Sequence, residues 1–257
     1  LMGFFLLFSF SQTSFANENK VVFIEIKGDI DFSKTALVKK AIGKANEINA
    51  KVLFVEIDTF GGYVDAAVKI RDMISESNLD TICYVKNRAW SAGALIAISH
   101  KHIAIAPGGS IGAAEPIPTS EKTVAALKAE FAATANKLGR DPKVAEAMVD
   151  KSLGYKQYAK EGQILALTDY QAIEVGYADL VATDANQVLN HFGYQNAEII
   201  TCEEGALENL SGILSNPTVK GALITIIFLA IMAEIKTAGS GIAIIIAFIA
   251  AALFFSS

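Results

Sequence analysis

Ser91 is the residue of this sequence best placed for chemistry, because it stands between a predicted strand and a predicted helix. The apolar run Asp80 to Val85 predicts a buried strand, and the small and apolar residues Ala92 to Ser99 predict a compact helix. A serine at such a turn has its hydroxyl at the edge of a sheet, and the first N–H groups of the helix have no partners within it. A nucleophile and half of an oxyanion hole require this arrangement.

A second turn of this kind lies earlier in the chain. Val52 to Ile57 is an apolar run that predicts a strand, and Asp58-Thr59-Phe60-Gly61-Gly62 follows it. Paired glycines at a strand end let a backbone N–H approach a ligand without a Cβ in the way. Small residues around Ser91 are also typical of a helix packed closely on a sheet, and taken alone they favour packing. The glycine turn adds the second donor that an oxyanion hole needs.

The composition predicts one sizeable folded domain with membrane-related ends. The chain has 257 residues, enough for a full core, and its net charge of −5 offers no basic patch for nucleic acid. Mean hydropathy is +0.38, and the apolar excess is concentrated at the two ends. Residues 1–16 have the apolar core and small-residue ending of a secretory signal, so we expect cleavage near Ala16.

Two apolar segments stand at the other end, Ala222 to Ile235 and Gly241 to Phe255. Each is shorter than the roughly 20 residues that span a bilayer. Either they extend into their flanks or they form a tight or re-entrant hairpin. We expect a transmembrane helical hairpin over 219–257, and we expect the natural chain to continue beyond it.

Between these ends, strands alternate with helices. This alternation predicts an α/β fold with a mostly parallel sheet and right-handed crossovers. The predicted strands are 20–26, 52–57, 81–85, 102–105, 111–114 and 180–182, and the predicted helices are 33–46, 65–77, 92–99, 121–138, 141–150 and 168–176.

We expect the folded domain over 17–185 and a linker over 186–218, in which 205–216 forms an amphipathic helix that lies on the membrane. Cys83 in a buried strand and Cys202 in the linker predict two free thiols rather than a disulfide framework. No cluster of His, Cys and carboxylates has the spacing of metal ligands, so we expect no metal and no organic cofactor.

Four ordered motifs carry a family resemblance. Asp58 to Gly62, Ser91-Ala92-Gly93, Gly109 to Gly112 and Gly139-Arg140 resemble, in this order and on these elements, the NfeD long-form membrane proteases. These are ClpP/crotonase-like serine peptidases related to signal peptide peptidase A. The resemblance covers residues 20 to about 183, and it implies repeated ββα units with a mostly parallel sheet, followed by transmembrane helices.

The resemblance also implies roles for individual residues. Ser91 matches the nucleophile, and Gly62 and Ala92 match the positions whose N–H groups form the oxyanion hole, with Gly61 as the alternative donor. The helix 121–138 would carry the lysine base of a Ser–Lys dyad. Such a lysine accepts the serine proton only when burial brings its pKa down towards the working pH.

The sequence departs from the family pattern at two positions. Ala132 stands where the lysine is expected, so either Lys128, one turn earlier on the same helical face, is the base or the position is vacant. Phe60 stands where relatives usually carry proline in the glycine turn. For His100 and His102, at a strand entrance, surface or structural roles are favoured over replacing the lysine as base.

The resemblance implies a membrane-anchored serine endopeptidase, with its protease domain outside the cytoplasm, that cleaves apolar segments of membrane-associated proteins. The partners implied are stomatin-, flotillin- or prohibitin-like membrane proteins, the lipid bilayer, and further copies of the chain in a homo-oligomer. The alternative is a catalytically impaired membrane scaffold that assembles with such a partner. Ala132 favours the scaffold, and the intact Ser91 and glycine turn favour the peptidase. The secretory start and the apolar C-terminal segments disfavour a crotonase-type acyl-CoA enzyme.

Overall fold

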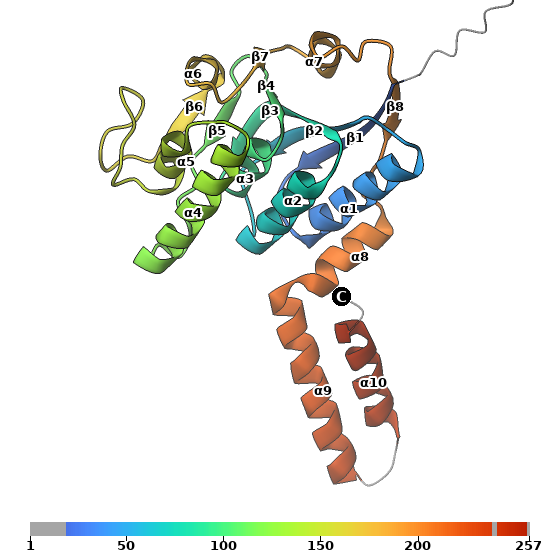
Figure 1. The fold of residues 1–257 in the computed structure, drawn as a ribbon. Coiled ribbons are helices and arrows are strands. Elements are labelled where there is room, and N and C mark those ends of the chain that lie inside the picture. The colour runs from blue at the N-terminus through green and yellow to red at the C-terminus, as the bar shows by residue number, and fades with distance from the viewer. Residues whose placement is uncertain (1–18, 238–240, 256–257) are drawn as a thin grey trace, which may run out of the picture.

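The computed structural model describes residues 19–237 and 241–255, so the signal predicted over 1–16 lies outside the described residues. A sheet domain, residues 19–215, carries two apolar helices that extend away from it (Figure 1). The strands are β1 (Lys20–Lys27), β2 (Val52–Thr59), β3 (Asp80–Trp90), β4 (His102–Ile105), β5 (Ser110–Gly112), β6 (Ala166–Thr168), β7 (Leu180–Val181) and β8 (Glu198–Thr201). The helices are α1 (Phe32–Glu47), α2 (Val64–Glu76), α3 (Ala92–Ile98), α4 (Glu121–Lys137), α5 (Pro142–Val149), α6 (Asp169–Glu174), α7 (Ala185–His191), α8 (Ala206–Ser215), α9 (Pro217–Thr237) and α10 (Ile242–Phe255).

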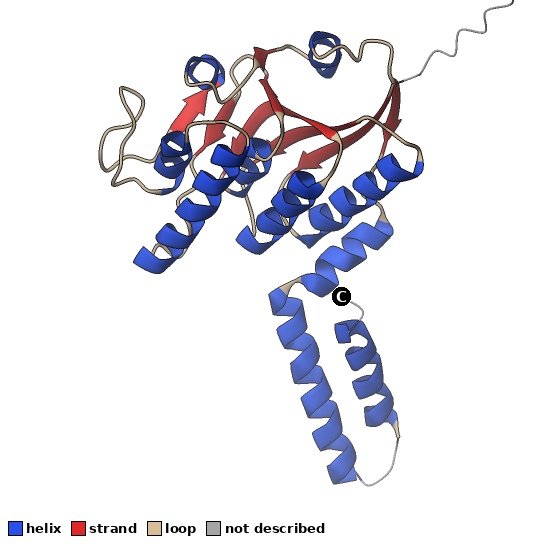
Figure 2. Ribbon diagram, viewed as in Figure 1, coloured by secondary structure: helices blue, strands red, loops and turns tan. Residues whose placement is uncertain are grey.

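The strands form one mostly parallel sheet, as the sequence predicts. Its order is β6-β5-β3-β2-β1-β8, and β4 and β7 continue from β3 beside this path. The β5–β6 pair is antiparallel, and the other strand pairs of the described residues are parallel. Helices cover both faces of the sheet (Figure 2). Because β2 is central and covered on both faces, it begins with the continuous apolar run Val52 to Val55 rather than with an alternation of apolar and polar residues.

The length of β3 determines where the site lies. The sequence predicts a strand over 81–85, and the structure extends it to Trp90. The first half pairs with β4, whereas Arg88 to Trp90 pair with Ser110 to Gly112 of β5. The polar residues Lys86 to Arg88 interrupt the apolar run, so the sequence pattern does not predict this second half of the strand. β3 therefore changes partners along its length and ends directly at Ser91.

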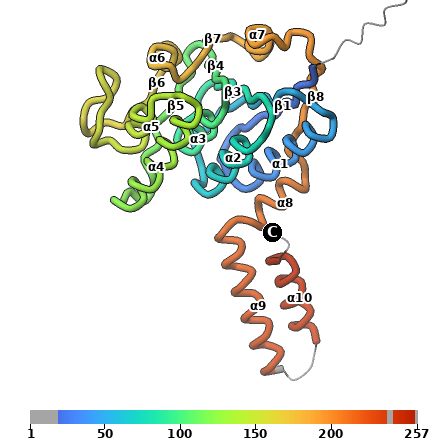
Figure 3. Tube along the Cα trace, viewed as in Figure 1, coloured from blue at the N-terminus to red at the C-terminus, as the bar shows by residue number. Residues whose placement is uncertain are grey.

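Two hydrophobic cores hold the helices to the sheet. The larger core includes Ile70 of α2, Leu95 of α3 and Phe131 of α4. The smaller core lies on the other face, where Val188 and Leu189 of α7 pack against the sheet. The Cα trace shows α7 on the opposite side of the sheet from α1 and α2 (Figure 3). The larger core places the first turns of α2 and α3 at the same edge of the sheet.

The sheet domain continues past residue 185, where the sequence predicts its end. β8 pairs with β1, and the Cys202 N–H donates to the Phe23 carbonyl at 2.9 Å. Cys202 therefore belongs to the sheet domain and not to a linker. Both cysteines are free and buried. The residues of β8 are mostly exposed and do not alternate with buried ones, so the strand has no apolar pattern.

The C-terminal helices follow the sheet domain without a long linker. α8 lies against α1, and a Cβ at Gly212 would lie 2.7 Å from the Ser33 Cβ, so glycine permits close packing there. α9 reaches beyond the apolar segment predicted from 222 and begins at Pro217. Over the described residues, α9 is the one helix long and apolar enough to cross a membrane: its segment Pro217–Lys236 has 20 residues and a mean hydropathy of 2.0, and α10 is shorter. The two helices lie side by side (Figure 1).

Arg140 lies in the turn between α4 and α5, and it connects this turn to the residues at the end of α3. Ser91 stands at the start of the same helix. The Arg140 guanidinium donates to the carbonyls of Ile98 at 3.2 Å, His100 at 2.9 Å and Lys101 at 3.1 Å, and its side chain is buried.

Arg140→Ala should lower the free energy of unfolding by about 3 kcal/mol, because these carbonyls lose their donor. Urea denaturation of the detergent-solubilised chain measures this loss. Lys143→Ala, on the exposed side of α5, is the control, and a loss no larger than the control would contradict the prediction.

Candidate active site

Ser91 lies at a strained turn between β3 and α3. It has φ 52° and ψ −120°, and its N–H donates to the Gly112 carbonyl at 2.9 Å. A non-glycine residue in such a conformation costs about 1–3 kcal/mol, and it persists only where the surroundings enforce it. A strained strand-to-helix turn exposes a serine hydroxyl at the sheet edge, as in nucleophilic serine sites of other α/β folds.

The glycine turn lies directly beside Ser91. Gly61 has φ 124°, and a Cβ there would lie 2.6 Å from the Ser91 Cβ; at Gly62, with φ 158°, it would lie 2.2 Å from the Ile30 carbonyl oxygen. Only glycine fits at either position. Thr59 holds the turn, since its hydroxyl accepts from the Gly61 N–H at 2.9 Å and donates to the Gly28 carbonyl at 2.6 Å.

The N–H groups of Gly62 and Ala92 remain open to a ligand oxygen. Across residues 19–237 and 241–255, no protein acceptor takes either group. Both residues line the pocket that Ser91 also lines. The Gly61 N–H, the alternative donor, is bonded to Thr59. Of the predicted donors, Gly62 and Ala92 are thus the pair whose N–H groups could bind an oxyanion.

The Ser91 pocket has a volume of about 250 Å³ and mostly apolar walls. Its lining residues are Phe60, Gly62, Val64, Ala67, Ser91, Ala92, Leu95, Glu115, Pro116, Ile117, Leu127 and Phe131. Glu115 is the one charged residue of this lining, and its carboxylate pairs with Lys151 at 2.8 Å. Such a pocket fits an apolar peptide side chain better than a charged one.

The two residues considered for the general base lie outside this lining. Leu127 and Phe131 are the residues of α4 that face the pocket. The Lys128 ammonium donates to the Asp150 carboxylate at 2.8 Å, and Ala132 is half-buried without a titratable group. To accept the serine proton, Lys128 would first have to leave Asp150 and lose a proton. Its role as the base stays a prediction.

His100 and His102 lie beyond the end of α3 that is far from Ser91, and both are packed against other residues. His100 is fully buried, its Nδ1 lies 2.8 Å from the Ile96 carbonyl oxygen, and burial lowers its pKa to about 4. His102 stacks on Phe192 with ring centroids 4.4 Å apart. Neither histidine lines the Ser91 pocket.

Sequence reasoning missed the aromatic group beside the nucleophile. The exposed Phe60 ring meets Trp90 edge-on at 5.5 Å, and the Arg88 guanidinium lies 4.4 Å from the centre of the Phe60 ring. With Phe60 at the position where the resemblance leads us to expect proline, the turn is held by the hydrogen bonds of Thr59 to Gly28 and Gly61. The available signal was a pair of aromatic residues, Phe60 directly before the paired glycines and Trp90 directly before Ser91.

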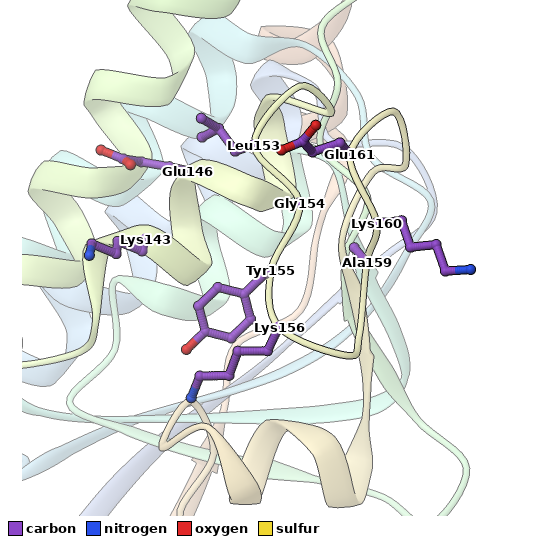
Figure 4. Close-up of a pocket in the computed structure, with 9 residues that line it drawn as sticks. All are labelled: Lys143, Glu146, Leu153, Gly154, Tyr155, Lys156, Ala159, Lys160 and Glu161. Atoms are coloured by element: carbon purple, nitrogen blue, oxygen red, sulfur yellow. The ribbon is translucent and has the colours of Figure 1, made fainter.

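A larger concavity, about 720 Å³, lies away from Ser91 around residues 153–161 (Figure 4). It is lined by Lys143, Glu146, Leu153, Gly154, Tyr155, Lys156, Ala159, Lys160 and Glu161, and Figure 4 shows the Lys160 side chain pointing away from Tyr155. No Ser, Cys or His lines it, and the described residues hold no group of three His, Cys, Asp or Glu suited to a metal ion. The Ser91 pocket therefore remains the candidate active site.

The fold defines a class of known structures. Two structures of the 1510-N membrane-bound stomatin-specific protease, a serine-to-alanine variant and a lysine-to-alanine variant with a substrate peptide, cover 72% and 76% of this chain and 97% and 96% of their own. Their TM-scores are 0.64 and 0.66 at 28% and 27% identity. ClpP1 from Listeria monocytogenes, at 16% identity, covers 65% of this chain and 94% of its own with a TM-score of 0.52, and shows the shared fold alone. The sheet domain thus has the ClpP-like fold.

The family follows from the sequence comparisons. Residues 20–202 match the family described as NfeD1b, N-terminal domain, so the chain belongs to the NfeD1b family. It is 32% identical over 263 residues to the membrane protein NfeD1b of Bacillus subtilis, covering 99% of this chain. It is 31% identical over 185 residues to the membrane-bound protease PH1510 of Pyrococcus horikoshii, covering 67% of this chain. The chain spans 60% of the length of the first relative and 39% of the second.

The strain at Ser91 predicts a difference between two substitutions. Ser91→Ala keeps a side chain at φ 52°, whereas Ser91→Gly removes it. The glycine variant should therefore be more stable than the alanine variant by about 1 kcal/mol, although glycine also gains freedom in the unfolded chain. Urea denaturation of both variants measures the difference. A glycine variant less stable than the alanine variant by about 0.5–1 kcal/mol, the ordinary cost of glycine's freedom in the unfolded chain, would show that the turn is not strained.

The Lys128–Asp150 pair predicts a titration. Hydrogen bonds from Lys128, and next from Ser152, lower the pKa of Asp150 from 3.8 to about 2. Since the unfolded chain has the higher pKa, the stabilisation by this carboxylate is complete at neutral pH and is lost as the pH falls from about 4 to about 2.

Lys128→Ala should therefore raise the pKa of Asp150 towards 3.8, with the Ser152 bonds keeping it slightly lower. Carboxyl carbon NMR of the detergent-solubilised chain measures the shift, and Lys122→Ala at the exposed start of α4 is the control. An unchanged Asp150 pKa would show that Lys128 is not committed to this carboxylate.

Proposed function

We propose that this chain is a membrane-anchored serine peptidase of the ClpP-like class that acts on apolar segments of membrane-associated proteins. The observation that carries the proposal is the enforced strain at Ser91 beside the two open N–H groups of Gly62 and Ala92. A turn that served packing alone would be more stable with glycine at residue 91. A hydroxyl that reacts would explain why serine and not glycine stands at this turn.

In the proposed reaction, the Ser91 Oγ attacks the carbonyl carbon of a peptide bond. The negative charge that develops on the carbonyl oxygen is stabilised by the N–H groups of Gly62 and Ala92. A base takes the serine proton and then gives it to the leaving amine, and water hydrolyses the resulting ester. Lys128 is the candidate base. It lies one helical turn from Ala132, the position where the lysine is expected.

The apolar pocket and the relatives support the substrate class. Leu95, Leu127 and Phe131 line the pocket and suit an apolar side chain. The solved relatives are described as specific for stomatin or a stomatin homologue. We propose a stomatin-like partner for this chain by that similarity, with flotillin- and prohibitin-like proteins as related candidates.

The membrane placement in this proposal depends on α9. The two relatives are described as a membrane protein and a membrane-bound protease, and α9 has the length and apolarity of a span. We propose that α9 and α10 anchor the chain as a hairpin. The signal predicted over 1–16 supports a sheet domain outside the cytoplasm, and self-association remains part of the proposal.

A second candidate function is a catalytically impaired scaffold that binds the same partner. Two observations favour it: Ala132 has no titratable group, and Lys128 is held by Asp150. The serine and the lysine exchanged in the two solved variants are separated by the spacing that separates Ser91 from Ala132 here. A scaffold of this kind would bind an apolar peptide at the Ser91 pocket without cleaving it.

Cleavage and binding of one apolar peptide from a stomatin-like protein separate the two functions. As a peptidase, the chain should cleave the peptide, and Ser91→Ala and Lys128→Ala should each lower kcat/KM by a factor of about 10² or more, whereas the control Lys122→Ala should not. As a scaffold, it should bind without cleaving.

Ala132→Lys completes the comparison. If this variant cleaves and the unaltered chain only binds, the site is a peptidase site that has lost its base. If no variant, including Ala132→Lys, cleaves or binds the peptide, the peptidase proposal and the scaffold proposal are both wrong for this partner.

A further inference from the structure

Large apolar side chains are exposed around the mouth of the Ser91 pocket. They are Phe60, Tyr63, Val64 and Ile117, which we call the apolar rim. Phe60 is 64% exposed and Ile117 is 97% exposed. Phe60, Val64 and Ile117 also line the pocket, so the rim continues its apolar walls outward. A cluster of exposed apolar residues beside a functional pocket indicates a surface that contacts something other than water.

The rim is joined to the first turn of the candidate membrane helix. The Asn216 side-chain amide, one residue before α9, donates to the Tyr63 hydroxyl at 3.1 Å. Tyr63 follows the oxyanion donor Gly62 and stacks on Phe32, with ring centroids 6.1 Å apart. The start of α9 and the mouth of the Ser91 pocket therefore lie at the same edge of the sheet domain.

α8 holds this arrangement and extends the apolar surface. Its inner side packs on α1 through Gly212, and Figure 1 shows it between α1 and the helices α9 and α10. Its exposed residues Leu207, Leu210 and Ile213 recur every third position and so share one face.

Two lysine side chains lie beside the apolar rim and the start of α9. Lys69 of α2 and Lys220 in the first turn of α9 line the same surface hollow with Phe32, whose ring lies 5.0 Å from the Lys69 ammonium. Apolar residues flanked by lysines, next to a membrane helix, match the boundary between lipid headgroups and acyl chains.

We propose that the apolar rim and the outer face of α8 rest on the bilayer that α9 enters, so that the Ser91 pocket opens onto the membrane surface. This inference rests on the membrane anchoring in the proposed function. It specifies the route to the site: an apolar segment leaving the membrane reaches Ser91 without crossing bulk water. Substrate segments next to a membrane span would thereby be favoured over the same sequences in solution.

Trp90 is a native reporter for this proposal, because it is the single tryptophan of the chain and its ring lies against Phe60. The full chain is reconstituted in phosphatidylcholine and phosphatidylglycerol vesicles whose acyl chains carry a doxyl group either near the headgroup or near the chain end. We expect the shallow label to quench roughly half of the Trp90 fluorescence and the deep label to quench clearly less, because the rim enters only the boundary region.

Three variants test which surface is responsible. Ile117→Asp on the rim and Leu210→Asp on α8 should each reduce the shallow quenching, and two variants on different elements guard against misfolding of one. Tyr170→Asp on α6 is the matched control, since Tyr170 is 73% exposed and α6 lies on the side of the sheet domain away from α9 (Figure 1).

Flotation of the vesicles separates the two ways of failing. A chain that floats with the vesicles but shows no shallow quenching is anchored with its rim elsewhere, either in water or against another copy, and this result overturns the inference alone. A chain that does not float overturns the anchoring as well, and with it the membrane placement in the proposed function.

Discussion

The conformation of Ser91 is the constraint on which the rest of the structure depends. A serine at φ 52° needs its neighbours to enforce it. β3 continues past its first partner to pair with β5, and the Gly112 carbonyl of β5 accepts the Ser91 N–H at 2.9 Å. On the other side, Gly61 permits a contact that no other residue would allow. Two strand ends and a glycine turn thus meet at one hydroxyl.

The fold follows from the sequence where burial is symmetric or periodic. β2 is buried on both faces, and its apolar run predicts a central parallel strand. β4 falls at the predicted residues, and the predicted ends of α1, α2 and α4 lie within a residue or so of the observed ones. β8 and the second half of β3 were not predicted, because few buried apolar side chains accompany their backbone pairing. Strand pairing at an edge depends on the partner and leaves little trace in composition.

The site could be predicted in part. Ser91 and the glycine turn were recognisable because their chemistry requires particular residue types at particular turns. The side-chain direction of Lys128 could not be predicted, because residues four apart on a helix share a face only approximately. Its partner Asp150 lies outside α4. The link between Tyr63 and Asn216 was equally invisible, because it joins residues far apart in the chain. Contacts between side chains of distant elements leave no periodic pattern in the sequence, so they cannot be predicted from it.

The presence or absence of a base beside Ser91 decides between a peptidase and a scaffold. An oxyanion hole and a strained serine can lower the barrier to acyl transfer only if the serine proton has somewhere to go. In this chain the walls beside Ser91 are apolar, and the one carboxylate of the pocket lining is paired with Lys151. The peptidase and the scaffold of the proposed function would both use these apolar walls to bind a peptide, so the two proposals share one pocket.

The most direct test of the account is covalent labelling of the full chain by a fluorophosphonate, with the modified residue located by mass spectrometry. The account predicts an adduct on Ser91 that is absent from Ser91→Ala and forms faster in Ala132→Lys, because the oxyanion donors are already in place and a nearby lysine would supply the base. No adduct on Ser91 in either the unaltered chain or Ala132→Lys would contradict the claim that this turn is built around a reactive serine.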